Sequence, residues 1–132
     1  MSKPADSAEF EIVVHGRERI LEVRYPSRPT AESYARYETA VRAAIEAWRG
    51  EWDCLVDQSA LSLMPPELPP VIAVLNAWAR GKGMRRTARV VKDSAVAELQ
   101  VNRILRESGT AQVGSLYKTR AQAWAALTAP KS

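Results

Sequence analysis

The sequence predicts an α/β domain built on a mostly parallel sheet of four or five strands, with an opening β-hairpin and about four helices. Short apolar segments alternate along the chain with segments whose apolar residues recur every three or four positions. Glycine, proline and helix-capping residues separate these segments. Strands that alternate with helices require parallel pairing and crossover connections. The 132 residues suit one domain, which we expect over 9–128, between a flexible N-terminus (1–8) and a short tail (129–132).

The first part of the chain is predicted to form a hairpin followed by a helix. Two extended apolar segments, 10–14 and 20–23, flank a turn at 15–16. A proline-rich stretch then interrupts the extended chain, and Thr30 is placed to cap a helix. Apolar residues at helical spacing follow over 34–48, and a glycine soon afterwards ends the helix.

The middle of the chain is predicted to form the centre of the sheet. The segment 52–57 is apolar on both faces over part of its length, as in a central strand. Proline is tolerated in a first helical turn, so a helix is expected from about Leu68 to Arg80. The next strand is expected at 87–91.

The last part is predicted to add two helices and one strand. A third helix is expected between a cap at 93–94 and Gly109, and a weak last strand at 112–117. Thr119 and Gln122 have the spacing of a capping box, which opens the final helix.

A local excess of positive charge stands out against a net charge of only +4. Six basic residues and no acidic residue lie between positions 80 and 92, so they carry +6 and the rest of the chain carries −2. If 85–91 is a regular strand, Arg85 and Arg89 share one face and Arg86 takes the other. We favour docking of an acidic partner protein or a merely solvated edge. A small anionic or lipid ligand is an open alternative; nucleic acid is disfavoured because no recognition motif or stacking aromatics accompany the charge. The basic residues are Arg80, Lys82, Arg85, Arg86, Arg89 and Lys92.

The residue types that enzymes need are scarce. The chain has one histidine, His15, expected exposed in the hairpin turn, and one cysteine, Cys54, expected buried and unreactive. Asp53 and Asp57 lie four residues apart on a strand, about 13 Å, which is too far for paired acid and base catalysis on one bond. Nucleophile-elbow, dinucleotide-binding, phosphate-loop and zinc-binding motifs are absent from the sequence. We therefore expect no enzyme activity, no metal and no cofactor.

Segments that would direct the chain to a membrane are also missing from the sequence. No apolar run approaches the roughly 20 residues of a membrane span, and the first ten residues are too polar for a signal peptide. We expect a cytoplasmic protein without a transmembrane segment.

Residues 55–64, LeuValAspGlnSerAlaLeuSerLeuMet, resemble the segment in which STAS domains of the SpoIIAA-like type end their central strand and enter the next helix. Asp57 and Met64 match the family pattern without gaps. Residues 116–127 also look like the close of SpoIIAA-like domains, where an aromatic-ended strand leads to a helix with an Ala and Trp pattern. The resemblance implies a STAS-like fold over nearly the whole chain.

The resemblance further implies reversible docking onto a partner protein, such as a kinase, an anti-sigma factor or another signalling protein. The implied docking residues are Asp57, Ser59, Met64 and Glu67. The family's phosphorylated serine motif is replaced here, so that Glu67 stands near the phosphoserine position. Glu67 is interpreted either as a permanent acidic substitute for phosphoserine or as an ordinary glutamate favoured by a helix N-terminus.

The neighbouring polar residues also have two interpretations each. Ser59 and Ser62 are the nearest remaining hydroxyls, and each is either a phosphorylation site or a turn residue. Asp57 ends a strand where doubly wound sheets carry ligand or partner surfaces, but it is equally suited to hold the backbone of the following loop. A carrier or sensor of an apolar, lipid-like ligand remains the alternative function, and a homodimer is compatible with the resemblance.

Overall fold

The structure is a computed structural model, and it describes residues 8–62, 64–91 and 114–129. The hairpin consists of β1 (Glu11–His15) and β2 (Ile20–Arg24) and leads into α1 (Ala31–Glu46). The chain continues through β3 (Trp52–Gln58), α2 (Leu68–Gly81) and β4 (Met84–Val91). It ends with β5 (Gly114–Tyr117) and α4 (Arg120–Thr128). The helix expected at 93–109 lies outside the described residues.

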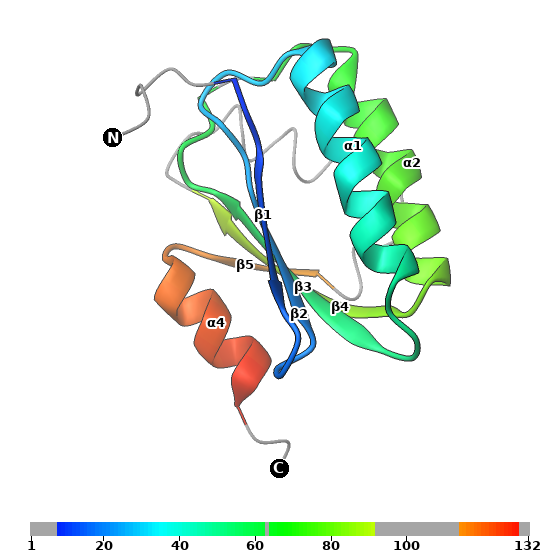
Figure 1. The fold of residues 1–132 in the computed structure, drawn as a ribbon. Helices are drawn as coiled ribbons and strands as arrows, with labels where there is room; N and C mark the ends of the chain where they lie inside the picture. Colours follow the sequence, from blue (N-terminus) through cyan, green and yellow to red (C-terminus); the bar gives the residue numbers. More distant parts are fainter. Residues whose placement is uncertain (1–7, 63, 92–113, 130–132) are drawn as a thin grey trace.

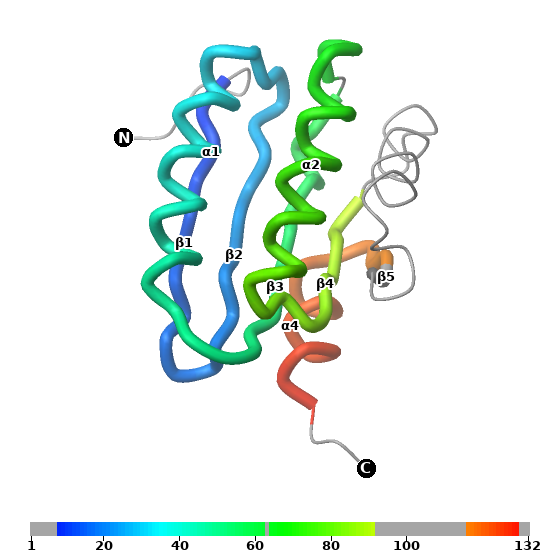
Figure 2. The backbone as a smooth tube through the Cα atoms, turned by 90° about the vertical axis from the view of Figure 1, so that its right-hand side faces the viewer, coloured from blue at the N-terminus to red at the C-terminus, as the bar shows by residue number. Residues whose placement is uncertain are grey.

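The five strands form one sheet in sequence order, β1-β2-β3-β4-β5. The β1–β2 pair is antiparallel, and the other three pairs are parallel. Helices α1 and α2 lie side by side on one face of the sheet, whereas α4 lies on the other face (Figures 1 and 2). The predicted mostly parallel sheet with an opening hairpin is therefore confirmed.

Two apolar clusters hold these layers together. The larger one lies between the sheet and α1 and α2, and it includes Tyr37, Val41, Trp52 and Ile72. The smaller one fills the space under α4, where Ala123 and Leu127 pack on Leu55 of the central strand. Because side chains of a strand alternate between faces, β3 contributes to both clusters.

Local signals account for the boundaries of α1. The Thr30 side chain accepts a hydrogen bond from the Ser33 N–H, and the Ser33 side chain accepts one from the Thr30 N–H, which completes a capping box. The predicted cap of α4 is confirmed in part. Thr119 accepts from the Gln122 N–H, but the Gln122 side chain accepts from the Lys118 N–H rather than from that of Thr119.

Two expectations about strand ends need correction. Strand β4 begins at Met84, three residues before the predicted start, because an irregularity in its pairing with β3 keeps Arg85 and Arg86 within the sheet beside Asp53. His15 belongs to β1 rather than to an exposed turn, and its side chain is 23% exposed. The turn lies one residue further on, from Gly16 to Arg19.

Candidate functional site

The loop between β3 and α2 lies at the end of the sheet where β2, β3 and β4 end and α1 and α2 begin (Figure 1). This β3–α2 loop is described for residues 59–62 and 64–67. Leu61 and Met64 anchor it in the core, 4% and 1% exposed respectively. Apolar anchors of this kind fix the course of a loop and leave its polar residues at the surface.

Asp57 and Ser59 form a turn at the start of the loop. Asp57 Oδ1 accepts hydrogen bonds from the Ser59 N–H at 3.0 Å and from the Ser59 hydroxyl at 2.6 Å. This is the loop-holding role that was one of the two interpretations of Asp57. The other interpretation, a place at a ligand or partner surface at the end of the strand, stays a prediction.

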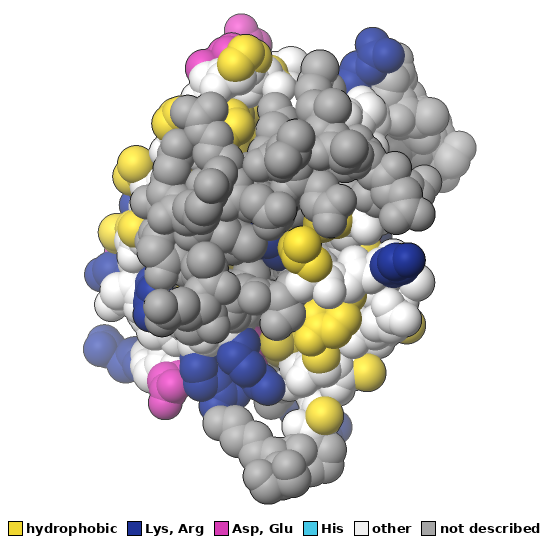
Figure 3. Space-filling model, turned by 180° about the vertical axis from the view of Figure 1, so that it is seen from behind, with side chains coloured by type: hydrophobic (Ala, Val, Ile, Leu, Met, Phe, Trp, Pro, Cys, Tyr) yellow, Lys and Arg dark blue, Asp and Glu magenta, His cyan; other side chains and the backbone are white. Residues whose placement is uncertain are grey.

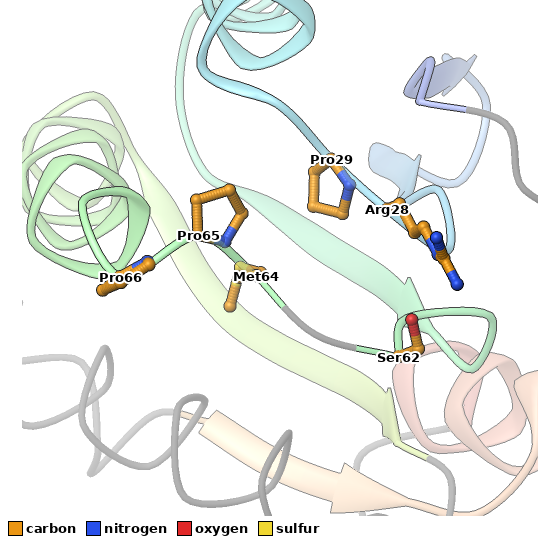
Figure 4. A pocket seen from close by; sticks show the side chains of 6 residues that line it. All are labelled: Arg28, Pro29, Ser62, Met64, Pro65 and Pro66. Atoms are coloured by element: carbon orange, nitrogen blue, oxygen red, sulfur yellow. The ribbon is translucent and has the colours of Figure 1, made fainter.

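A pocket of about 430 Å³ opens beside the loop. The β2–α1 connection provides Arg28 and Pro29, and the β3–α2 loop provides the other lining residues, Ser62, Met64, Pro65 and Pro66 (Figure 4). The Ser62 hydroxyl donates to the Ser27 carbonyl at 2.9 Å, which ties the two connections together. Proline rings on both sides give the pocket fixed apolar walls, because proline has few accessible backbone conformations.

Glu67 lies at the N-cap of α2, exposed, and makes no capping hydrogen bond. An N-cap side chain normally accepts from the N–H groups of the second or third helical residue. In α2 those residues are Pro69 and Pro70, which have no N–H. The Glu67 carboxylate therefore faces solvent at a helix end that favours negative charge.

The four residues implied by the resemblance thus have different positions. Glu67 is exposed, and Ser59 is half-buried. Met64 is almost fully buried among the core residues and also lines the pocket, so its contribution to a docking surface stays a prediction. Its apolar side chain supports the loop from below. Asp57 orients the start of the loop.

The six basic residues at 80–92 do not form one patch. Arg85 and Arg86 both pair with Asp53, at 3.0 and 2.8 Å, because the irregular pairing places both opposite this carboxylate. Burial raises the pKa of Asp53, but the hydrogen bonds from Arg86 and Arg85 lower it more. Lys82 pairs with Glu46, Arg80 is exposed, and Lys92 lies outside the described residues.

Arg89 is the largest departure from the expected patch, because it is buried on the face covered by α1 and α2 and is only 2% exposed. The expectation that Arg85 and Arg89 share a face of the sheet is wrong. The irregular pairing of β4 with β3 places Arg85 beside Asp53, whereas Arg89 lies in the core. On the face shown in Figure 3, the Lys and Arg side chains gather in separate groups rather than in one continuous strip.

A buried glutamate that the sequence pattern did not single out organises the opposite face of the sheet. Glu22 of β2 is 1% exposed and accepts two hydrogen bonds from Arg120 of α4, at 2.7 and 2.8 Å. His15 Nε2 lies 2.9 Å from the same carboxylate, and the His15 ring packs edge-on against Trp124. The Arg120 hydrogen bonds lower the pKa of Glu22 from 4.5 to about 2, against the opposing effect of burial. A charged residue within the apolar strand 20–23 was the available sequence signal.

The described residues contain no cluster of three or more potential metal ligands. Cys54 is buried as expected, and burial raises the pKa of its thiol to about 12. None of the described helices is both long and apolar enough to cross a membrane.

Comparison with known proteins identifies the fold. Neither a family model nor a curated protein matches the sequence. The crystal structure of an anti-sigma factor antagonist from Mycobacterium paratuberculosis matches 96% of this chain and 98% of its own, with a TM-score of 0.59 and 16% sequence identity. At this identity the likeness concerns the fold and not the activity. The chain therefore has the STAS-like, SpoIIAA-like α/β fold that the segments 55–64 and 116–127 suggested.

Proposed function

We propose that the protein is a non-enzymatic regulatory module inside the cell that binds a partner protein through the β3–α2 loop. The contact surface would consist of Glu67, the half-buried Ser59, the exposed Ser62 and the proline walls of the neighbouring pocket. Asp57 and Met64 would hold this surface in shape from within. The similar structure is described as an anti-sigma factor antagonist, and an anti-sigma factor or a related kinase is the partner class we infer for this chain.

The observation that carries the proposal is the solvent-exposed carboxylate of Glu67, which makes no capping hydrogen bond. Folding leaves it exposed, and no described residue forms an ion pair or hydrogen bond with it. A carboxylate in this position is available to a cationic group of a partner. A hydrogen bond to a charged group contributes about 1.5–3 kcal/mol, so loss of the Glu67 charge should weaken binding measurably. In our proposal Glu67 provides permanently the negative charge that phosphoserine provides reversibly in the family.

The adjacent pocket supports the same surface. Its walls are prolines from two separate connections, so a partner side chain can enter without ordering a flexible loop first. Arg28 adds a positive group at the rim, and Glu67 follows Pro66 directly. A partner segment with an apolar anchor and charges of both signs would match this arrangement.

The test is affinity capture from native cells with the wild-type protein and three variants. Glu67→Gln removes the charge at nearly constant size, Glu67→Asp retains it, and Glu18→Gln alters an exposed glutamate in the β1–β2 turn at the opposite end of the sheet. A protein captured by the wild type is purified, and its affinity for all four proteins is measured. We expect Glu67→Gln to weaken binding about tenfold, and Glu67→Asp and Glu18→Gln to change it little.

The outcomes separate the proposed roles. Equal binding by Glu67→Gln and wild type would refute the interpretation of Glu67 as an acidic substitute for phosphoserine. It would leave intact the proposal that the protein is a docking module. Mass spectrometry of phosphopeptides from the same eluates tests whether Ser59 or Ser62 is phosphorylated. Lipid extraction tests the alternative function, because a stoichiometric lipid without a protein partner would favour a carrier.

A further inference from the structure

Strand β1 forms one edge of the sheet, with β2 as its only neighbour among the described strands (Figure 2). In an edge strand, every second residue directs its N–H and C=O away from the neighbouring strand, where another strand can bind them. Proteins usually protect such an edge with lysine, proline, a bulge or a very short strand. The opposite edge strand, β5, has only four residues, but β1 contains neither lysine nor proline and pairs with β2 in a continuous register. The edge of β1 is therefore open to a further strand.

The side chains of β1 also leave apolar surface exposed on both faces of the sheet. Val14 is 50% exposed and lies on the same face as Ile12, which packs against the core under α1 and α2. Val13 is 39% exposed and lies on the opposite face, beside its cross-strand neighbour Glu22. An occupant that covers both valines must contact the two faces of the sheet at once. An added strand does this, because its side chains alternate between the faces.

The sequence of β1 is complementary to itself in the antiparallel direction. With a twofold axis at Val13, Val13 lies opposite Val13 of a second copy, and Ile12 lies opposite Val14. The Glu11 carboxylate then lies opposite the His15 imidazole at both ends of the paired strands, and the His15 side chain is 23% exposed. Apolar pairs at the centre and polar pairs at the ends stabilise antiparallel pairing. The occupant that β1 fits is therefore a second β1.

A cavity of about 150 Å³ at this edge leaves room for the second copy. It lies between β1 and α1, and its lining includes Ile12 from β1 and Tyr37 and Ala40 from α1. Val14 of the second copy would lie opposite Ile12 and point to the same face, so its side chain would reach the mouth of this cavity. Ala40 is exposed on the α1 side, and its short side chain leaves this approach open.

We propose that two copies of this chain associate by antiparallel pairing of their β1 strands, about a twofold axis at Val13, into one continuous sheet. Backbone hydrogen bonds across the axis satisfy the open edge, and Val13 and Val14 of each copy become covered. No residue of β1 lines the pocket beside the β3–α2 loop, so each copy keeps its docking surface and the dimer is bivalent.

The first experiment measures mass by light scattering and sedimentation over a dilution series of the full-length protein. Val14→Lys places a charge on the edge strand at an exposed position, and far-UV circular dichroism checks that it folds. Val74→Lys is the matched control, because Val74 is 63% exposed on α2. One strand per copy makes a small interface, so we expect a wild-type dimer that dissociates on dilution. Val14→Lys should raise the dissociation constant at least about tenfold, and Val74→Lys should leave it unchanged.

The second experiment tests the position of the axis by cross-linking through single cysteines. Val13→Cys places two cysteines opposite each other, with Cα atoms about 4.5–5.5 Å apart, which a disulfide can join. In Val14→Cys the two Cα atoms would lie about 8 Å apart, which is too far. The wild type controls for Cys54, which is buried. We expect oxidised glutathione to convert Val13→Cys to a covalent dimer and to leave Val14→Cys and the wild type without a cross-link.

Three results would overturn the proposal. The first is a protein that stays monomeric over the whole dilution series. The second is a dimer that Val74→Lys dissociates and Val14→Lys does not, because its interface would lie on α2. The third is equal cross-linking of Val13→Cys and Val14→Cys. None of these results depends on Glu67 or on the docking of another protein.

Discussion

The ion pair between Glu22 and Arg120 leads to a quantitative prediction about stability. Glu22 is almost fully buried, and the hydrogen bonds from Arg120 lower the pKa of its carboxyl from 4.5 to about 2. A pKa difference of 2.5 units at 1.36 kcal/mol per unit corresponds to about 3 kcal/mol of folding free energy at pH 7. Glu22→Gln keeps the shape and removes the charge, so we expect it to reduce the free energy of unfolding by about this amount.

The pH dependence has a definite sign. The folded-state pKa lies below the unfolded-state value, so the stabilisation is complete above about pH 4.5 and disappears as the pH falls through 2. The difference between wild type and Glu22→Gln should shrink from about 3 kcal/mol at pH 7 to about 1 kcal/mol at pH 2.5. Titrating groups remote from Glu22 are common to both proteins and cancel in this difference.

Urea unfolding monitored by tryptophan fluorescence at a series of pH values measures both quantities. Glu38→Gln is the matched control, because Glu38 also pairs with an arginine, Arg42, but in a partly exposed helical pair. Such pairs contribute about 0.3–0.5 kcal/mol. A cost of Glu22→Gln no larger than that of Glu38→Gln, or one that is the same at pH 7 and pH 2.5, would refute the assignment of this energy to the buried charge.

Two further predictions concern the backbone and the core. Gly83 has φ of 106°, and an added Cβ would lie 2.4 Å from the carbonyl oxygen of Gly50, so Gly83→Ala should reduce the free energy of unfolding by at least about 2 kcal/mol. Gly16→Ala, where the added Cβ would meet nothing within 4 Å, should be nearly neutral, and equal urea midpoints for the two variants would contradict the argument. Cys54 is 8% exposed and its thiol has a pKa of about 12, so a thiol reagent at pH 8 should modify it only as fast as the protein unfolds, and rapid labelling of the native protein would show that the site is open.

Much of the fold could be predicted because its signals are local. Thr30 and Thr119 mark helix starts through their own side chains, and the proline pair at 69 and 70 is tolerated in a first helical turn. The same pair explains a feature of the candidate site, since it deprives Glu67 of capping donors. The resemblance at 55–64 identified the β3–α2 loop, but not that Met64 is buried or that Arg28 and Pro29 complete the pocket.

The distribution of charge could not be predicted, because it depends on contacts between distant segments. A single irregularity in the pairing of β3 with β4 brings Arg85 and Arg86 to the carboxylate of Asp53, and Arg89 lies in the core. The basic segment 80–92, which looks continuous in the sequence, is thereby divided. His15 belongs to β1 rather than to the turn, and its ring contacts Trp124, more than a hundred residues later in the chain. Its Nε2 lies beside the Glu22 carboxylate, to which Arg120 also binds.

The sequence by itself determined the order of strands and helices, the capped helix starts and the burial of Cys54, since these follow from periodicity and from residues within a few positions of each other. Only the tertiary structure decided which charges are paired, which are exposed and which are buried without a partner. Glu22 and Arg120 are 98 residues apart, and only strand register places Gln58 and Arg89 on the same face of adjacent strands. The free energy of a charge depends on its surroundings in three dimensions, and the spacing of residues along the chain does not specify those surroundings.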